Sequence, residues 1–272
     1  MNSKNETQNM PNKSIKSKAQ NENACDDMHD DAQENACENV RDGAHENALV
    51  LCSGGLDSST LLALSVERFG ANHVKALSIS YGQKHIRELK SARNICAFYK
   101  VPLTEIDLSP IFAQSNCSLL SHSNEPVPHE SYESQLADKQ TTIASTYVPY
   151  RNGLFISTAA SIALSLDCQV LLYGAHHDDW AGNAYPDCSP EFVHALAQAV
   201  SLGSGNTLRL EAPFVNWNKA RIVKEGLRLH VPYELTWSCY EGREQPCGTC
   251  GTCIDRARAF AENKVTDPLL MR

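Results

Sequence analysis

The stretch ALVLCSGGLDSSTLL, residues 48–62, passes from an apolar run through a short polar turn and into a second apolar run. Residues 48–52 predict a buried strand, and residues 58–70 predict a helix. Gly54 and Gly55 lie in the turn, where glycine can adopt the positive φ angles that direct successive backbone N–H groups toward one anion. The helix N-terminus adds its partial positive charge. The stretch therefore predicts a phosphate-binding turn at the carboxyl end of a strand.

Strand-like and helix-like segments alternate after Ala48, which predicts an α/β fold whose parallel sheet carries helices on both faces. Ligands of such sheets lie beyond the carboxyl ends of the strands, where the opening turn lies. One predicted helix, 152–167, is apolar nearly all round and is expected to be buried. The predicted strands are 48–52, 74–81, 103–109, 169–175 and 207–214, and the other predicted helices are 58–70, 86–100, 191–200 and 217–229.

Composition divides the chain into three parts. Residues 1–47 are polar, lack aromatic residues and repeat a short Glu-Asn-Ala motif, which predicts a disordered low-complexity tail; an acidic partner-binding segment is the alternative. Residues 48–235 are expected to form the nucleotide-binding domain, and residues 236–272 a C-terminal metal-binding segment. Residues 110–147 are polar and fit a mobile loop or small insertion.

Charge and hydropathy exclude several functional classes for the 272-residue chain. The net charge is −8, but residues 21–48 alone carry nine acidic residues against one arginine, and residues 1–20 carry four lysines against one glutamate, so the chain after residue 48 is only mildly acidic. This balance argues against a large nucleic-acid-binding face. No apolar run reaches 18 residues, which argues against a membrane partner, and no export signal is recognisable, so we expect a cytoplasmic protein.

Four of the eleven cysteines gather near the C-terminus. Cys239 precedes Cys247, and Cys250 and Cys253 follow at intervals of three residues. Four thiolates at this spacing suit a closed tetrahedral structural site for one Zn²⁺ ion per chain. The spacing lacks the further cysteine of a bacterial ferredoxin-type iron–sulfur cluster, which makes that cluster the weaker interpretation.

The turn differs from the other common phosphate-binding loops, because the G-x-x-x-x-G-K-[ST] spacing and its lysine are absent. The SGGLDS motif closely resembles the PP-loop of the ATP pyrophosphatases, which cleave ATP between its α and β phosphates and adenylate an acid or carbonyl oxygen. Asp57 is placed to hold Mg²⁺ or to cap the helix. The residues expected to bind ATP are Cys52, Ser53, Gly54, Gly55, Leu56, Asp57, Ser58, Ser59, Thr60, Leu61 and Leu62.

From Ala48 onward, the chain resembles the 7-cyano-7-deazaguanine synthase family of queuosine biosynthesis. The resemblance rests on six stretches in family order and on the four cysteines: SGGLDSST, ISYGQKHIRELKSA, YVPYRNGLFISTAASIAL, YGAHHDDWAGNAYPDC, APFVNWNKA and the terminal cysteine group. It implies an adenine-nucleotide α-hydrolase-like fold, one zinc ion, and an enzyme that is often dimeric. It also implies an ATP-dependent carbon–nitrogen ligase that converts 7-carboxy-7-deazaguanine and ammonia to the nitrile.

Residue type and position nominate the remaining candidates. Lys219 begins a predicted helix after the last strand and is expected, with Asp57 and Arg151, to act in catalysis by stabilising phosphate or acyl-adenylate charge. Asp187 could accept hydrogen bonds from the N–H groups of a guanine-like edge. Tyr185 and Asn152 are the other expected substrate contacts, and Asp178 and Asp179 are further candidates for Mg²⁺.

Three alternatives stay open at this point. A PP-loop tRNA thiolase would use Cys188 or Cys239 as the catalytic thiol, although no basic RNA-binding domain is evident. An amidating ligase of the NAD or GMP synthetase type would lack the four cysteines. A zinc-ribbon interaction module would use the glycine turn only structurally, so it would not bind ATP in the presence of magnesium.

Overall fold

The computed structural model describes residues 46–271 apart from 85–86, 132–133, 135–142 and 182–183. The whole α/β domain lies within residues 45–272. Residues 1–45 of the predicted tail lie outside the described residues. The last two residues of that tail, Glu46 and Asn47, are described and contact the domain: Arg209 pairs with Glu46, and the amide of Asn47 donates to Gln169.

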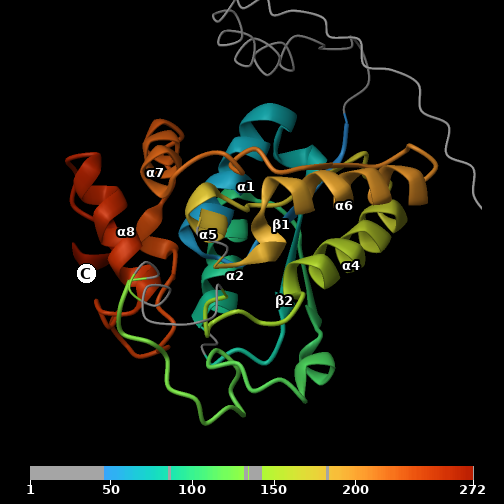
Figure 1. The fold of residues 1–272 in the computed structure, drawn as a ribbon. Helices are drawn as coiled ribbons and strands as arrows, with labels where there is room; N and C mark the ends of the chain where they lie inside the picture. The colour runs from blue at the N-terminus through green and yellow to red at the C-terminus, as the bar shows by residue number, and fades with distance from the viewer. Residues whose placement is uncertain (1–45, 85–86, 132–133, 135–142, 182–183, 272) are drawn as a thin grey trace, which may run out of the picture. The chain divides into compact units, whose positions relative to one another are not determined.

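Five parallel strands form one sheet in the order β3-β2-β1-β4-β5 (Figure 1). The chain extends the sheet in one direction from β1 to β3 and then returns to place β4 on the other side of β1. The carboxyl ends of β1 and β4 therefore border the crevice at which such folds bind ligands. The strands are β1 (Ala48–Leu51), β2 (Val74–Ser80), β3 (Leu103–Asp107), β4 (Val170–Leu172) and β5 (Arg209–Glu211).

Helices cover both faces of the sheet (Figure 1). One face packs against α1, α2, α7 and α8, and the other packs against α4 and α6. The α-helices are α1 (Leu56–Phe69), α2 (Arg87–Tyr99), α4 (Arg151–Ser165), α5 (His177–Trp180), α6 (Pro190–Gly203), α7 (Lys219–Arg228) and α8 (Gly251–Glu262). Short 3₁₀ turns are η2 (Ala71–His73), η3 (Ser109–Phe112), η5 (Pro186–Cys188), η6 (Tyr233–Leu235) and η7 (Pro268–Met271).

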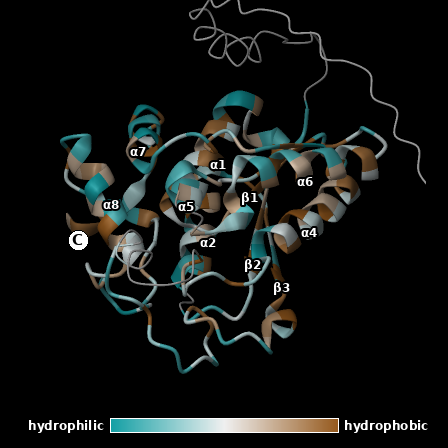
Figure 2. Ribbon diagram, viewed as in Figure 1, coloured by the Kyte–Doolittle hydropathy of each residue, from teal (hydrophilic) through white to brown (hydrophobic). Residues whose placement is uncertain are grey.

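The central strands are buried on both faces, which explains why they are apolar without alternation. In β1, Val50 belongs to the hydrophobic cluster beneath α1 and α7, whereas its neighbour Leu49 belongs to the cluster beneath α4 and α6. The strands are accordingly mostly brown in Figure 2, and α7, whose outer side meets water, is mostly teal. Among the described residues, no helix is both long and apolar enough to cross a membrane.

The predicted α/β architecture is confirmed, and its differences from the structure are local. The helix predicted at 152–167 is α4, but Ser157, Ser161 and Leu164 on one side of it are exposed, so it is not buried all round. Helices α5 and α8 were not predicted, because the sequence around the start of each shows polar or cysteine residues and no helical apolar period. Within residues 110–147, the segment predicted as a loop, Leu120 forms an isolated β-bridge with Gln83.

Gly54 fixes the turn between β1 and α1 against helix α2. Its φ angle is +85°, which side chains rarely tolerate. A Cβ atom at this position would lie 2.3 Å from the backbone nitrogen of Ala92 and 2.5 Å from the carbonyl oxygen of Glu88. Because both obstacles are backbone atoms of α2, they cannot rotate away. Only glycine therefore allows the turn to pack this closely.

We expect Gly54→Ala to destabilise the protein by about 3 kcal/mol, because the substitution combines a strained φ angle with a backbone clash. Urea denaturation followed by circular dichroism measures this change. Gly203→Ala is the matched control, since a Cβ atom at Gly203 meets nothing within 4 Å. The control is expected to leave stability unchanged or to raise it slightly. Equal effects of the two substitutions would contradict the close packing at Gly54.

Candidate active site

The turn after β1 presents an organised set of hydrogen-bond donors. The Ser53 hydroxyl accepts the N–H of Gly55 at 3.3 Å and lies 3.0 Å from the Ser58 hydroxyl. Gly55 is the N-terminal cap residue of α1, and no side chain caps this helix. The N–H groups of its first turn therefore have no intrahelical acceptor and are available to an anion.

Four charged or titratable side chains meet beside this turn. Lys219, the first residue of α7, places its Nζ atom 3.6 Å from Oδ2 of Asp57. The Nε2 atom of His176 lies 3.5 Å from the same oxygen and 3.3 Å from Oδ2 of Asp179. His176 follows β4 and Asp57 follows β1, so the adjacency of these strands brings the two residues together. The result is a compact cluster of two carboxylates and two bases.

The cluster shifts the pKa values of its members. Burial alone would raise the pKa of Asp57, but the nearby Lys219 ammonium and His176 hold it well below its usual value. Burial would lower the pKa of His176, yet Asp179 and Asp57 raise it overall. The pKa of Lys219 is likewise raised by Asp57 and Asp179 against the effect of burial. The lysine is therefore a permanent cation beside the phosphate-binding turn.

Two polar atoms in this cluster have no hydrogen-bond partner among the described residues. They are Oδ1 of Asp57 and Nδ1 of His176, and both atoms are buried. A buried carboxylate oxygen without a donor is unfavourable unless a ligand or cation completes it. The carboxylate of Asp57 is therefore suited to a hard cation, for which oxygen atoms are the preferred ligands.

A cavity of about 230 Å³ extends from the turn toward the N-terminus of α4. Asp57 and Lys219 lie at the end formed by the turn. Its other end is lined by flat or polar side chains: Tyr81, Arg151, Asn152, Phe155, Tyr173, Tyr185 and Cys188. One cavity thus joins an anion-binding turn to a partly aromatic pocket, a combination that suits a phosphate-containing ligand and a planar heterocycle.

Arg151 supplies a cation at the aromatic end of the cavity. Its guanidinium carbon lies 4.9 Å from the centre of the Tyr81 ring and 5.9 Å from that of Phe155. Burial would lower the pKa of Arg151, but Tyr81 and Asp187 keep it above its usual value. It makes no ion pair with a described carboxylate. Arg151 is therefore held by its aromatic neighbours and can bind an incoming carboxylate or phosphate.

The buried carboxylate of Asp187 holds Asn152, the residue that follows Arg151 in α4. The backbone N–H of Asn152 donates to Oδ2 of Asp187 at 3.0 Å, and its side-chain amide donates to Oδ1 at 3.1 Å. Burial raises the pKa of Asp187, whereas the N–H groups of Asn152 and the charge of Arg151 act in the opposite direction. Asp187 is only 3% exposed and is not among the residues that line the cavity, although Asn152 is.

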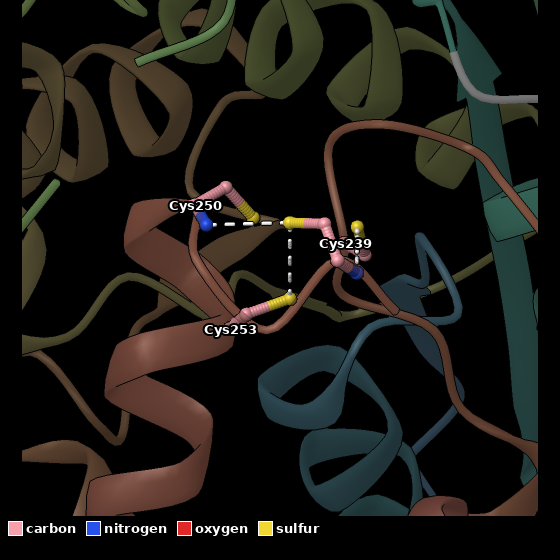
Figure 3. A group of neighbouring side chains, drawn as sticks. Cys239, Cys250 and Cys253 are labelled. Atoms are coloured by element: carbon pink, nitrogen blue, oxygen red, sulfur yellow. Dashed lines mark hydrogen bonds between the residues drawn. The ribbon is translucent and has the colours of Figure 1, made fainter. Parts of the chain in front are cut away.

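The four cysteines predicted as metal ligands come together. Their sulfur atoms all lie within 4.8 Å of one another, and Figure 3 shows three of them facing each other around the start of α8. Backbone N–H groups of Glu241 and Cys247 donate to the sulfur of Cys239. Such N–H···S bonds stabilise thiolates, and tetrahedral zinc coordination needs sulfur separations of about 3.8 Å. The arrangement therefore fits a metal ion.

The C-terminal segment that contains the four cysteines, residues 236–272, also borders the cavity; it is called the cysteine segment below. The backbone N–H of Trp237 donates to the carbonyl oxygen of Gly54 at 3.0 Å, which joins this segment to the phosphate-binding turn. Ser238, Tyr240 and Thr252 line the cavity wall. The segment that contains the four cysteines is therefore part of the site.

The comparisons with known proteins agree with this arrangement. Residues 47–264 match the model of a family described as "Queuosine biosynthesis protein QueC". The chain belongs to this family. It is 43% identical to the 7-cyano-7-deazaguanine synthase of Archaeoglobus fulgidus, over 82% of this chain and 89% of the relative. It is 45% identical to that of Caldicellulosiruptor saccharolyticus, over 81% of this chain and 93% of the relative.

A solved structure of NMN synthetase from Francisella tularensis aligns with this QueC-family chain at a TM-score of 0.44 and 16% identity, over 84% of this chain and 77% of that one. This likeness is too distant to add to the family assignment.

The structure of this QueC-family protein brings most of the predicted site residues to one cavity. Those that line it are Cys52, Ser53, Gly55, Leu56, Asp57, Ser58, Arg151, Asn152, Tyr185 and Lys219. The remaining predicted ATP contacts, Gly54, Ser59, Thr60, Leu61 and Leu62, do not line it. Leu61 and Leu62 face the hydrophobic core, and the Thr60 hydroxyl bonds to Leu56 and Tyr233, because α1 turns its inner side to the sheet.

Sequence reasoning assigned no role to several residues that the QueC-family cavity or cluster contains. His176 lies at the centre of the charged cluster, and Tyr81 and Tyr173 line the cavity. All three lie just beyond the carboxyl end of a strand, which is the signal that could have found them. Cys52, which sequence patterns assigned to ATP binding, reaches the cavity wall but is only 1% exposed and packs with Cys96 in the core beneath the turn.

We expect the stability difference between the wild type and Asp57→Asn to depend on pH. The folded pKa of Asp57 is depressed, so its stabilising contribution is present above the unfolded pKa and is lost as pH falls through the folded pKa. At neutral pH, the free energy of unfolding of the wild type should exceed that of the variant by on the order of 2 kcal/mol, and this difference should shrink below about pH 4. Urea denaturation without added magnesium at both pH values measures it, and a pH-independent difference would contradict the prediction.

Proposed function

We propose that this protein converts 7-carboxy-7-deazaguanine, ammonia and ATP to 7-cyano-7-deazaguanine. The observation that carries the proposal is the continuous cavity, which joins an anion-binding turn with Asp57 and Lys219 to an aromatic pocket with Arg151. Its relatives of more than 40% identity that are named 7-cyano-7-deazaguanine synthase support the same reaction.

The reaction needs two activations because a carboxylate is a poor electrophile. In the first, a carboxylate oxygen attacks the α-phosphorus of ATP, and the bond to pyrophosphate breaks. Ammonia then adds to the acyl carbon, AMP leaves with that oxygen, and a proton is lost to give the amide. In the second, the amide oxygen attacks the α-phosphorus of another ATP molecule and displaces pyrophosphate, and loss of AMP and of the two nitrogen-bound protons then gives the nitrile. Each step builds charge on phosphate oxygens.

The residues at the phosphate-binding end fit this demand for positive charge. The free N–H groups at the start of α1 would hold the departing pyrophosphate, and Lys219 would neutralise charge around the α-phosphate. The unpartnered oxygen of Asp57, with Asp179 nearby, would hold Mg²⁺, which supplies charge neutralisation when bound with ATP. Arg151 would hold the substrate carboxylate, and Tyr185 would contact the heterocycle.

The thiolase alternative finds no support in the positions of its two candidate cysteines. Burial raises the pKa of the Cys188 thiol well above its usual value, which disfavours a nucleophilic thiolate. Cys239 lies in the cluster of four cysteines. We therefore assign the four-cysteine cluster to one structural Zn²⁺ ion and place no cysteine in the chemical steps.

The cytoplasmic location and the homodimer remain predictions. No disulfide joins the described cysteines, which fits a protein of the reducing cytoplasm. A homodimer is implied by the family resemblance and is tested by sedimentation velocity.

The direct test incubates the wild type with ATP, Mg²⁺, ammonium and 7-carboxy-7-deazaguanine and identifies the products by mass spectrometry. The expected products are the nitrile, AMP and pyrophosphate. Unchanged substrate together with intact ATP would overturn the proposed function.

Lys219→Met is expected to lower kcat at least a hundredfold, because it removes the cation beside the transferred phosphorus. Lys224→Met is the matched control, since Lys224 lies on the same helix with its side chain exposed. The control should retain wild-type turnover. Full turnover by Lys219→Met would remove this lysine from the mechanism.

Cys250→Ser is expected to lose the bound zinc, to lower the melting temperature and to weaken ATP binding, because the cysteine segment is bonded to Gly54. Cys168→Ser is the control, since Cys168 is buried outside the cluster. Metal analysis, thermal denaturation and calorimetric ATP titration measure the three effects. Zinc retained by Cys250→Ser at the wild-type level would contradict the assignment.

A further inference from the structure

The first turn of α4 and the η5 turn hold one cavity-lining amide in a single orientation. Asn152 is the second residue of α4, and it is only 6% exposed but borders the cavity. Its Nδ2 atom donates to Oδ1 of Asp187 at 3.1 Å and to the sulfur of Cys188 at 3.2 Å. Both N–H bonds of this amide are therefore used within the protein.

The carbonyl oxygen is the remaining polar atom of this amide. Among the described residues, no group donates to Oδ1 of Asn152, although the residue lies in the cavity wall. An amide oxygen has two acceptor positions, and that of Asn152 is open to the cavity rather than enclosed within the protein. The cavity thus contains a fixed hydrogen-bond acceptor that a ligand with an N–H donor can satisfy.

Asp187 determines which end of the amide faces the cavity. An ionised carboxylate only accepts hydrogen bonds, so the amide must turn its N–H groups toward Asp187 and its oxygen away. The second oxygen of Asp187 accepts the backbone N–H of Asn152, which also fixes the position of the residue. A carboxylate at the N-terminus of α4 is further stabilised by the helix dipole.

We propose that Asp187 is a positioning residue that makes Asn152 a specificity-determining acceptor for an N–H group on the edge of the deazapurine. This inference rests on the proposed function, because it takes the heterocycle of that reaction as the ligand. Asp187 then acts through Asn152 rather than by touching the substrate. The pocket consequently prefers a guanine-type heterocycle, whose edge carries N–H donors, over one whose edge carries only acceptors at that position.

Reciprocal exchange of the two residues separates this role from direct contact. In Asp187→Asn, the new amide can accept the backbone N–H of Asn152 only by presenting its own N–H group to the side chain of Asn152. That side chain must then turn its oxygen inward and expose its N–H groups to the cavity. In the double variant Asn152→Asp with Asp187→Asn, the pair is restored and an acceptor oxygen again faces the cavity.

The experiment compares steady-state kinetics of the wild type, Asp187→Asn, Asn152→Asp and the double variant. Asp187→Asn should raise the KM for 7-carboxy-7-deazaguanine at least about tenfold, with the KM for ATP unchanged within about twofold. Asn152→Asp should raise the KM for 7-carboxy-7-deazaguanine further, because the carboxylates at positions 152 and 187 would face each other. The double variant should recover to within about threefold of the wild-type KM.

A matched control separates positioning from a loss of folding. Ser189→Ala removes the cap that accepts the N–H of Phe192 at the start of α6, two residues after Asp187, and leaves the hydrogen bonds of Asn152 in place. It should lower the melting temperature and leave both KM values unchanged. If Asp187→Asn leaves the KM for the deazapurine unchanged, or if the double variant is no better than Asp187→Asn, the inference is overturned.

Failure of the proposed function is recognised separately. If the wild type gives no nitrile, that function is overturned, and calorimetric titration of 7-carboxy-7-deazaguanine into the same four proteins then tests the inference by itself. The same order of affinities would support the acceptor role of Asn152. Equal affinities, or absence of binding to the wild type, would overturn it.

Discussion

The contact between Gly54 and the backbone of α2 is the constraint on which the site depends. It holds the turn after β1 against a helix that covers the sheet, while the carbonyl of the same residue accepts a hydrogen bond from Trp237. One residue without a side chain therefore fixes the phosphate-binding turn and the start of the cysteine segment together. The cysteine cluster and the charged cluster are consequently parts of one structure.

Charge is distributed along the cavity in a way that separates two tasks. Lys219 lies beside Asp57 at one end, and its pKa stays high because nearby carboxylates, chiefly those of Asp57 and Asp179, outweigh the effect of burial. Arg151 lies at the other end, against aromatic rings rather than against a carboxylate. A cation with a carboxylate partner suits a phosphate that arrives with a metal ion, whereas a cation without one can take a substrate carboxylate directly.

Much of this site follows from local sequence, whereas the positions of Asp187 and His176 depend on contacts between distant segments. The β1 turn and the cysteine spacing are readable because their residues act within a few positions of one another. The sequence suggests Asp187 as a substrate contact but does not reveal that both of its oxygens accept hydrogen bonds from Asn152. His176 could not be placed, since its partners Asp57 and Asp179 are brought to it by the pairing of β4 with β1.

The sequence by itself determined the alternation of strands and helices, the glycine turn at a helix N-terminus, and the four cysteines as a set that could hold a metal ion. These features depend on periodicity, backbone freedom and spacing, all of which are local properties. Only the tertiary structure decided which strand ends meet, which residues line the cavity, and how Asn152 is oriented. Those relations depend on strand order and on buried hydrogen bonds between distant segments, which local patterns do not specify.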